Sequence, residues 1–345
     1  MSNRAFIAAA VLVASVGCSQ GNLGLEAEGR YHARSTFETG RGIPEREAPE
    51  LSKFIALGTQ PDRVEEWLLD RLGERLGEPY QSLLNGLRDG YDVDNELRTY
   101  LSLVAPGYRD TLVRLAREMG DVTSTINLRS ELVLEADGFG RTGIVSHEIT
   151  GVWFELVPET VYVDFGEMGS VDPIVAASDF EVGDKVGSGE RMIYFGDQRV
   201  RLPYGRVLSY VMNEVLVERR DPFADSLSEL LGTTVPCNDI GDLLTTLLEA
   251  GTPELYGTAC AAAFGELGDA VLPDRLGTMT TSLTFEGEAV MVDSLDQNDL
   301  GDGLKNGQWE GTLGYPSTAV TLRRPGQVFS ADRSTARRDN EDETR

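Results

Sequence analysis

The spacing of the apolar residues changes near Asp121, and this change constrains the fold more than any other feature of the sequence. Before it, apolar residues recur three or four positions apart, which places them on one face of a helix. After it, Ile126, Leu128, Leu132 and Leu134 alternate with polar residues, a pattern typical of a half-buried strand. The sequence therefore predicts an α+β protein whose helical and strand segments are separate along the chain.

Length and charge narrow the class of protein. The chain has 345 residues, of which 41% are hydrophobic and 8% aromatic, so it can bury a sizeable core in one large domain or two modest ones. Its 57 acidic and 31 basic side chains give a net charge of -26. Because nucleic-acid binding requires a basic patch that neutralises phosphates, we expect no nucleic-acid partner.

Two helical regions are predicted within residues 59–120. The first begins near Asp62 and ends at Pro79, and the second covers 94–104 and resumes after a break over 108–120. We expect their apolar stripes to pack against a sheet or against each other, with a lipid groove as the alternative. The stripes contain Val64, Trp67, Leu68, Leu72 and Leu76, and then Tyr108, Leu112, Leu115 and Met119.

Residues 121–330 are expected to form an antiparallel, curved β-sheet that the N-terminal helices cover, with a helical insertion at about 203–272. The connections between the strands are too short for parallel crossovers. His147 lies on one strand, where we expect a structural role, and the Gly- and Asp-rich stretch near 166–190 has no strand pattern. The expected strands are 126–135, 144–150, 152–156, 160–165, 191–202, 283–291, 308–314 and 317–322.

Two segments lack a sustained hydrophobic period. Residues 18–58 are interpreted as a flexible tether in which His32 is solvated. Residues 331–345 have almost no apolar content and are interpreted as a disordered charged tail.

The first 17 residues have the features of a signal peptide. The uncharged apolar run Ala5–Gly17 has 13 residues, whereas a membrane-spanning helix needs about 20. Ser15-Val16-Gly17-Cys18 resembles the bacterial lipobox of proteins cleaved by signal peptidase II. The resemblance implies that Cys18 becomes the first mature residue and carries diacylglycerol and palmitate, while an ordinary secretory signal is the alternative.

The lipobox resemblance also implies a location. Outer-membrane lipoproteins usually lack Asp after the modified cysteine, and here Ser19 follows Cys18. Three acyl chains would hold the protein in one leaflet, since each buried methylene contributes about 0.8 kcal/mol. We therefore expect a lipid anchor in the outer membrane, on the periplasmic side or at the cell surface. Behind the lipobox, the order of helices and strands resembles uncharacterised lipoproteins of the myxobacterial type.

Cys237 and Cys260 remain once Cys18 is assigned to the lipid. In a compartment that permits disulfides, this even remainder predicts a bond, which would tie two helices of the insertion. Two separate buried thiols are the alternative. A catalytic cysteine is not expected, because no Cys-x-x-Cys occurs and both histidines lie far off in the sequence.

An acidic loop between two expected strands is the one cluster with the chemistry of a site. Asp293, Asp296, Asn298 and Asp302 supply oxygen ligands of the kind that calcium prefers, and glycines allow sharp bends between them. The spacing resembles an EF-type loop, but Leu300 takes the fifth position and no Glu takes the twelfth. A calcium site and a solvated acidic hairpin both remain open.

Other catalytic motifs are missing from the sequence. It has no Gly-x-Ser-x-Gly elbow, Walker loop, dinucleotide fingerprint or His-Glu-x-x-His. Gly307-x-Trp309-x-Gly311 resembles the Gly and Trp placement in small lipid-binding barrels, where it lies near the amino terminus, so we interpret Trp309 as a core anchor.

The function expected from these features is that of a lipid-anchored cell-envelope protein. As a noncatalytic binding or structural module, it would take an apolar ligand between helices and sheet. A carboxylate-dependent hydrolase with a calcium-stabilised loop is one alternative, and it requires two acids close together in a cleft. The other alternative is an accessory subunit of an envelope complex, with a protein partner on an exposed apolar patch.

Overall fold

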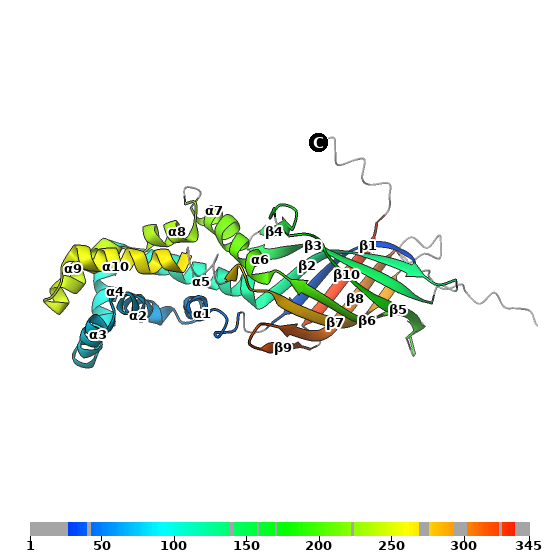
Figure 1. The fold of residues 1–345 in the computed structure, drawn as a ribbon, viewed down its shortest axis with the longest axis horizontal. Helices are drawn as coiled ribbons and strands as arrows, with labels where there is room; N and C mark the ends of the chain where they lie inside the picture. Colours follow the sequence, from blue (N-terminus) through cyan, green and yellow to red (C-terminus); the bar gives the residue numbers. More distant parts are fainter. Residues whose placement is uncertain are drawn as a thin grey trace, which may run out of the picture.

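The computed structural model describes residues 27–39, 43–138, 141–156, 159–169, 171–185, 187–188, 190–221, 224–268, 276–292, 302–323 and 326–334. A long antiparallel sheet closes into a barrel, and the helices gather at one end of it (Figure 1). The expected α+β class with an antiparallel, curved sheet is confirmed, and the helices cover the sheet at this one end.

Each strand of the barrel pairs antiparallel with the next, and the last strand pairs with the first. Closure leaves no open edge in the ring, and register shifts such as that between Arg129 and Ser130 help the sheet to curve. Two shorter strands, β4 (Glu159–Asp164) and β9 (Ala319–Leu322), pair with the second halves of β3 and β8. In order, the ring is β1 (Gly29–Glu38), β2 (Thr125–Ala136), β3 (Thr142–Leu156), β5 (Ile174–Asp184), β6 (Arg191–Leu202), β7 (Thr281–Val292), β8 (Gly303–Gly314) and β10 (Gln327–Arg333).

Strands β1 and β10 correct two expectations. The tether predicted for residues 18–58 is wrong where β1 lies, and the disordered tail predicted for 331–345 is wrong for 331–333, which end β10. The two strands pair with each other over seven positions and close the ring. His32 is exposed on the outer face of β1, as expected, while Tyr31 and Phe37 point into the core.

The structure differs from the expected strands at two further places. The stretch at 166–190 contains β5, which had no expected strand, and the segments expected at 144–150 and 152–156 form the single strand β3. Gly151 lies inside β3 because the neighbouring β4 comes close. A Cβ at this position would lie 2.4 Å from the carbonyl oxygen of Val163.

Helices occupy both regions where the sequence predicts them. The N-terminal set adds α1 within the expected tether and α3, whose first turn contains Pro79, a residue expected to end a helix. Proline suits this position because the first helical N–H groups have no partner within the helix. The N-terminal set is α1 (Pro49–Ala56), η1 (Pro61–Arg63), α2 (Val64–Leu76), α3 (Glu78–Gly90), α4 (Val93–Val104) and α5 (Tyr108–Ser124).

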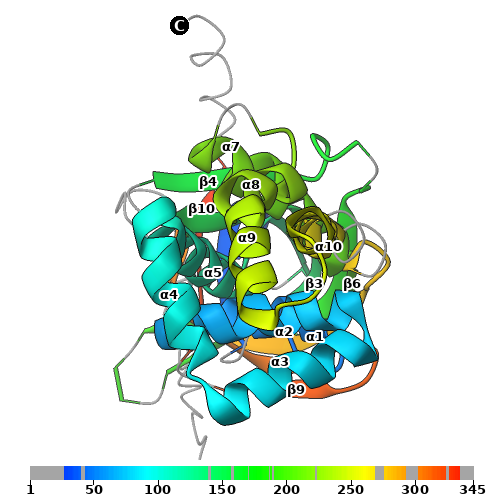
Figure 2. The same ribbon diagram turned by 90° about the vertical axis from the view of Figure 1, so that its left-hand side faces the viewer.

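The insertion between β6 and β7 supplies the other helices, including a π-helix, η2. Figure 2 looks onto the end of the molecule where the two sets meet. We call them together the helical cap. None of the described helices is long and apolar enough to cross a membrane. The insertion contains α6 (Tyr204–Tyr210), η2 (Val211–Val217), α7 (Glu218–Arg220), α8 (Leu227–Thr234), α9 (Cys237–Leu248) and α10 (Pro253–Glu266).

Candidate functional site

Most residues of the predicted lipid and calcium sites lie outside the described part of the chain. These are Cys18, Asp293, Asp296 and Asn298. Asp302 is described, and its main chain joins the start of β8 to Val292 and Arg333 through hydrogen bonds of 2.8 and 2.7 Å. The described ranges contain no group of three or more His, Cys, Asp or Glu that could hold a metal ion. Lipidation and calcium binding therefore stay predictions.

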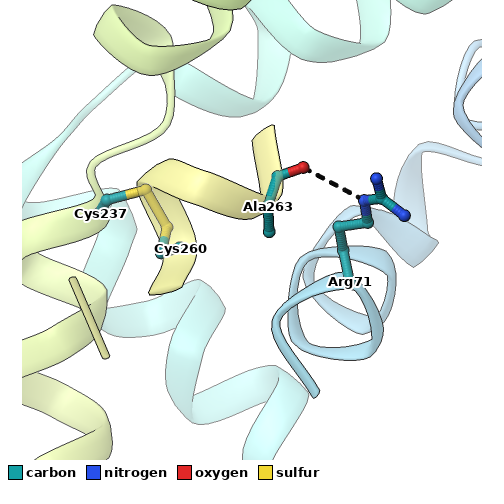
Figure 3. Close-up of a disulfide and its surroundings, with 4 residues drawn as sticks. All are labelled: Arg71, Cys237, Cys260 and Ala263. Atoms are coloured by element: carbon teal, nitrogen blue, oxygen red, sulfur yellow. Dashed lines mark hydrogen bonds between the residues drawn. A yellow bond between two sulfur atoms is a disulfide. The ribbon is translucent and has the colours of Figure 1, made fainter. Parts of the chain in front are cut away.

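The disulfide between Cys237 and Cys260 is confirmed. It joins the start of α9 to the middle of α10, with Cα atoms 5.4 Å apart (Figure 3). The two helices pack closely because Gly241 has no side chain, and a Cβ there would lie 2.4 Å from the carbonyl oxygen of Pro253.

The disulfide-linked pair is fixed to the N-terminal helices through α10. Arg71 of α2 donates a hydrogen bond from Nε to the carbonyl oxygen of Ala263 at 3.3 Å (Figure 3). One helical turn further, Arg75 forms an ion pair of 2.6 Å with Glu266. The two helical sets of the cap, which are far apart in sequence, therefore form one packed unit.

A chain of polar side chains lies inside the barrel. His147 Nε2 lies 2.7 Å from Ser130 Oγ, and its Nδ1 lies 2.6 Å from Gln198 Oε1. If Nδ1–H donates to Gln198, the hydroxyl of Ser130 donates to Nε2, and the neutral imidazole has both partners. Burial lowers the pKa of His147 to about 4, while the hydrogen bond with Gln198 acts in the opposite direction.

The order serine, histidine, glutamine resembles the arrangement of a hydrolytic triad, but aromatic rings pack around it. Trp309 stacks on Phe329 at 4.1 Å between centroids and meets Phe285 edge to face at 4.9 Å. Its indole N–H donates to Ser35 Oγ at 3.0 Å. These side chains and the polar chain are 4% exposed or less, so the hydroxyl of Ser130, which is bonded to the buried His147, is not open to a substrate in this packing. The geometry supports a structural role for His147 and confirms Trp309 as a core anchor.

An open groove lies on the helical cap, between α1 and α2. We call it the cap groove, and its volume is about 350 Å³. Trp67 belongs to its lining and packs between Phe54 of α1 and Phe264 of α10, with centroids 5.2 and 5.3 Å away. The apolar lining is Ala56, Leu57 and Trp67, and the polar lining is Glu45, Glu50, Ser52, Lys53, Gln60, Arg63, Asp70, Arg71 and Glu74.

Charged side chains at the cap groove neutralise one another. Arg71 bonds to Glu50 at 2.9 Å and to Glu74 at 3.2 Å, and Lys53 lies 3.2 Å from each of the same carboxylates. Burial lowers the pKa of Lys53, but its hydrogen bonds with Glu74 and Glu50 outweigh this effect and the pKa is raised. Because both carboxylates are held in ion pairs, the groove presents paired charges of both signs beside the apolar side chains of Ala56, Leu57 and Trp67.

A buried carboxylate holds α2 in place behind the groove. Glu65 is fully buried, and it accepts hydrogen bonds from Tyr108 at 2.6 Å and from Arg98 at 3.1 Å. Arg109 lies 3.6 Å from the same carboxylate. These partners come from α4 and α5, so the helix that carries Trp67 is anchored on its far side.

The sequence offers a groove only as the alternative for the helical apolar stripes, one of which includes Trp67. No pattern in the sequence marks the α1 side of the cap groove. Half of the lining comes from α1 and its flanks, within the segment interpreted as a tether. Comparison of the chain with models of known families, with curated proteins and with solved structures gives no match.

Proposed function

We propose that this chain is a lipid-anchored cell-envelope protein that acts as a noncatalytic binding module. The barrel is its rigid scaffold, and the cap groove is its binding surface. One observation carries the proposal: the centre of the barrel is filled by Trp309, Phe285 and Phe329, whereas the cap offers an open groove that has both apolar and charged side chains in its lining. Ligand sites are typically concave and mostly apolar, with a few polar groups that fix orientation.

The proposed location rests on the lipobox resemblance at Cys18. The disulfide between Cys237 and Cys260 supports it, because structural disulfides persist in oxidising compartments such as the periplasm and are rare in the cytosol. Ser19 favours the outer membrane. In this arrangement the lipid holds the chain to a leaflet, and the folded part projects from it.

The groove chemistry favours a peptide segment of an envelope protein partner over a purely apolar ligand. Trp67 and Leu57 offer apolar contact, while Lys53 and Arg63 lie on the same groove as Asp70 and several glutamates. A peptide can supply an apolar side chain together with flanking charges, so it satisfies both parts of this lining. A purely apolar ligand would cover these ion pairs without offering polar groups to replace their contacts with water.

Native mass spectrometry of the full chain, purified gently from membranes, tests this proposal. Ala56→Trp places a large ring in the groove, and Ala177→Trp makes the same change on the exposed outer wall of β5. We expect a stoichiometric partner to copurify with the wild type and with Ala177→Trp, and to be lost with Ala56→Trp. A partner retained by Ala56→Trp, or none in the wild type, would refute binding through the groove.

A further inference from the structure

A second concavity, independent of the cap groove, lies on the outer wall of the barrel. It covers the region where β10, β1, β2 and β3 run side by side, and its volume is about 600 Å³. Its polar lining consists of His32, Arg34, Arg129, Ser130, Glu131, Thr150, Ser330 and Asp332. The concavity therefore brings two arginines together on the surface of a strongly acidic chain.

Arg34 of β1 and Arg129 of β2 are direct cross-strand partners. Like charges in this position destabilise a sheet unless something neutralises them. Arg129 has such a partner, since it forms an ion pair with Asp164 of β4. The intervening position on β3 is Gly151, and a Cβ there would lie 3.3 Å from Asp164 Oδ1, so the absence of a side chain keeps this ion pair free of crowding.

Arg34 has no such carboxylate among the residues that the structure describes. Its guanidinium lies over the ring of Tyr162, 5.3 Å from the centroid. Two carboxylates line the same concavity. Glu131 forms an ion pair with Arg30 at 2.5 Å, and Asp332 lies opposite His32, one row along the sheet from Arg34. On β10 the residue opposite Arg34 in the sheet is Ser330, and both residues belong to the lining of the concavity.

We infer that this concavity binds a phosphate group. Side chains of neighbouring strands start about 5 Å apart, so Arg34 and Arg129 can both donate to the oxygens of one phosphate, and Ser330 supplies a third donor. Charge-assisted bonds from arginine are the strong contacts to such an oxyanion. The phosphate belongs to a free small molecule or to a phospholipid headgroup, which share this chemistry.

Calorimetric titration of the full chain in detergent with inorganic phosphate tests the site. Arg34→Gln removes the guanidinium that lacks a carboxylate. Its matched control, Arg199→Gln, removes an exposed arginine on β6 that faces Thr284 rather than another cation. We expect the wild type and Arg199→Gln to bind phosphate alike, and Arg34→Gln to bind about tenfold to a hundredfold more weakly, as expected for the loss of charge-assisted hydrogen bonds.

Repeating the titration in micelles that contain phosphatidylglycerol or phosphatidylcholine distinguishes the two sources. Competition by phosphatidylglycerol alone supports a headgroup ligand, and phosphate binding unaffected by either lipid supports a free one. Equal phosphate affinity in Arg34→Gln and the wild type would overturn the inference. So would the absence of phosphate binding in the wild type. Because Arg34 is exposed, circular dichroism of the variant should match that of the wild type and show that its fold is intact.

Discussion

Acidification is expected to destabilise the barrel through His147. This side chain is fully buried, and burial lowers its pKa from 6.5 to about 4 against the smaller opposing effect of Gln198. Between these two pH values the unfolded chain binds a proton that the folded chain does not bind. Stability therefore falls as the pH decreases through this window, and the loss is complete once the pH is below the folded value.

The size of the effect follows from the two pKa values. Each pKa unit corresponds to about 1.4 kcal/mol, so the interval between 6.5 and about 4 amounts to roughly 3 kcal/mol of unfolding free energy. Carboxylates elsewhere in the chain titrate in part of the same range. A variant without the imidazole is therefore needed to isolate the contribution of His147.

Urea unfolding at a series of pH values, followed by circular dichroism, measures this contribution. His147→Gln keeps a polar side chain but does not titrate, and the difference in unfolding free energy between the wild type and this variant cancels the carboxylates. Between about pH 7.5 and pH 4, we expect the unfolding free energy of the wild type to fall by roughly 3 kcal/mol more than that of His147→Gln. His32→Gln, which changes an exposed imidazole, should follow the wild-type curve. A difference that does not vary with pH would refute the reasoning.

Three further variants test the packing and the buried polar contacts. Trp309→Ala should lower the unfolding free energy by about 3 to 5 kcal/mol, because it empties the centre of the barrel; a cost below about 1 kcal/mol in urea would contradict the filled interior. Replacing Cys237 and Cys260 by serine should cost about 3 kcal/mol for a separation of 23 residues, and hydrogen exchange should rise in α9 and α10 while the barrel strands stay protected. Glu65→Gln should cost about 1 to 2 kcal/mol, because it weakens the hydrogen bonds from Tyr108 and Arg98, while the arginines left behind are about one-third exposed and stay hydrated; an unchanged thermal melt would contradict that role.

The sequence predicted the elements whose pattern is strong and local. The alternation at 126–135 became β2, and the stripe that includes Trp67 became α2. The pairing of Cys237 with Cys260 followed from counting cysteines, given the expectation of a compartment that permits disulfides. Each of these predictions needed only neighbouring residues or simple arithmetic.

The strands that close the barrel could not be predicted in the same way. Tyr31 pairs with Arg333, almost the whole folded chain away, and closure depends on this long-range contact. Within β1, two inward positions hold the small residues Ala33 and Ser35, so the hydrophobic alternation is weak. Ser35 is small and polar because it accepts the hydrogen bond of Trp309, a requirement visible only once β8 lies nearby.

The candidate sites depend on the same kind of distant approach. The cap groove forms where the eight residues of α1 meet α2, and a helix this short has little periodicity to detect. The phosphate site joins Arg34 to Arg129 through strand register alone. No local motif marks either place, because their residues become neighbours only in the folded chain.

Anchoring through Cys18 is the claim on which the proposed location and the proposed function both depend. Mass spectrometry of the amino-terminal peptide of the protein isolated from its native membranes tests it directly. We predict a mature chain that begins at Cys18, with a diacylglycerol on the thiol and a further acyl chain on the amino group. An unmodified Cys18, or a chain that starts at another residue, would contradict it.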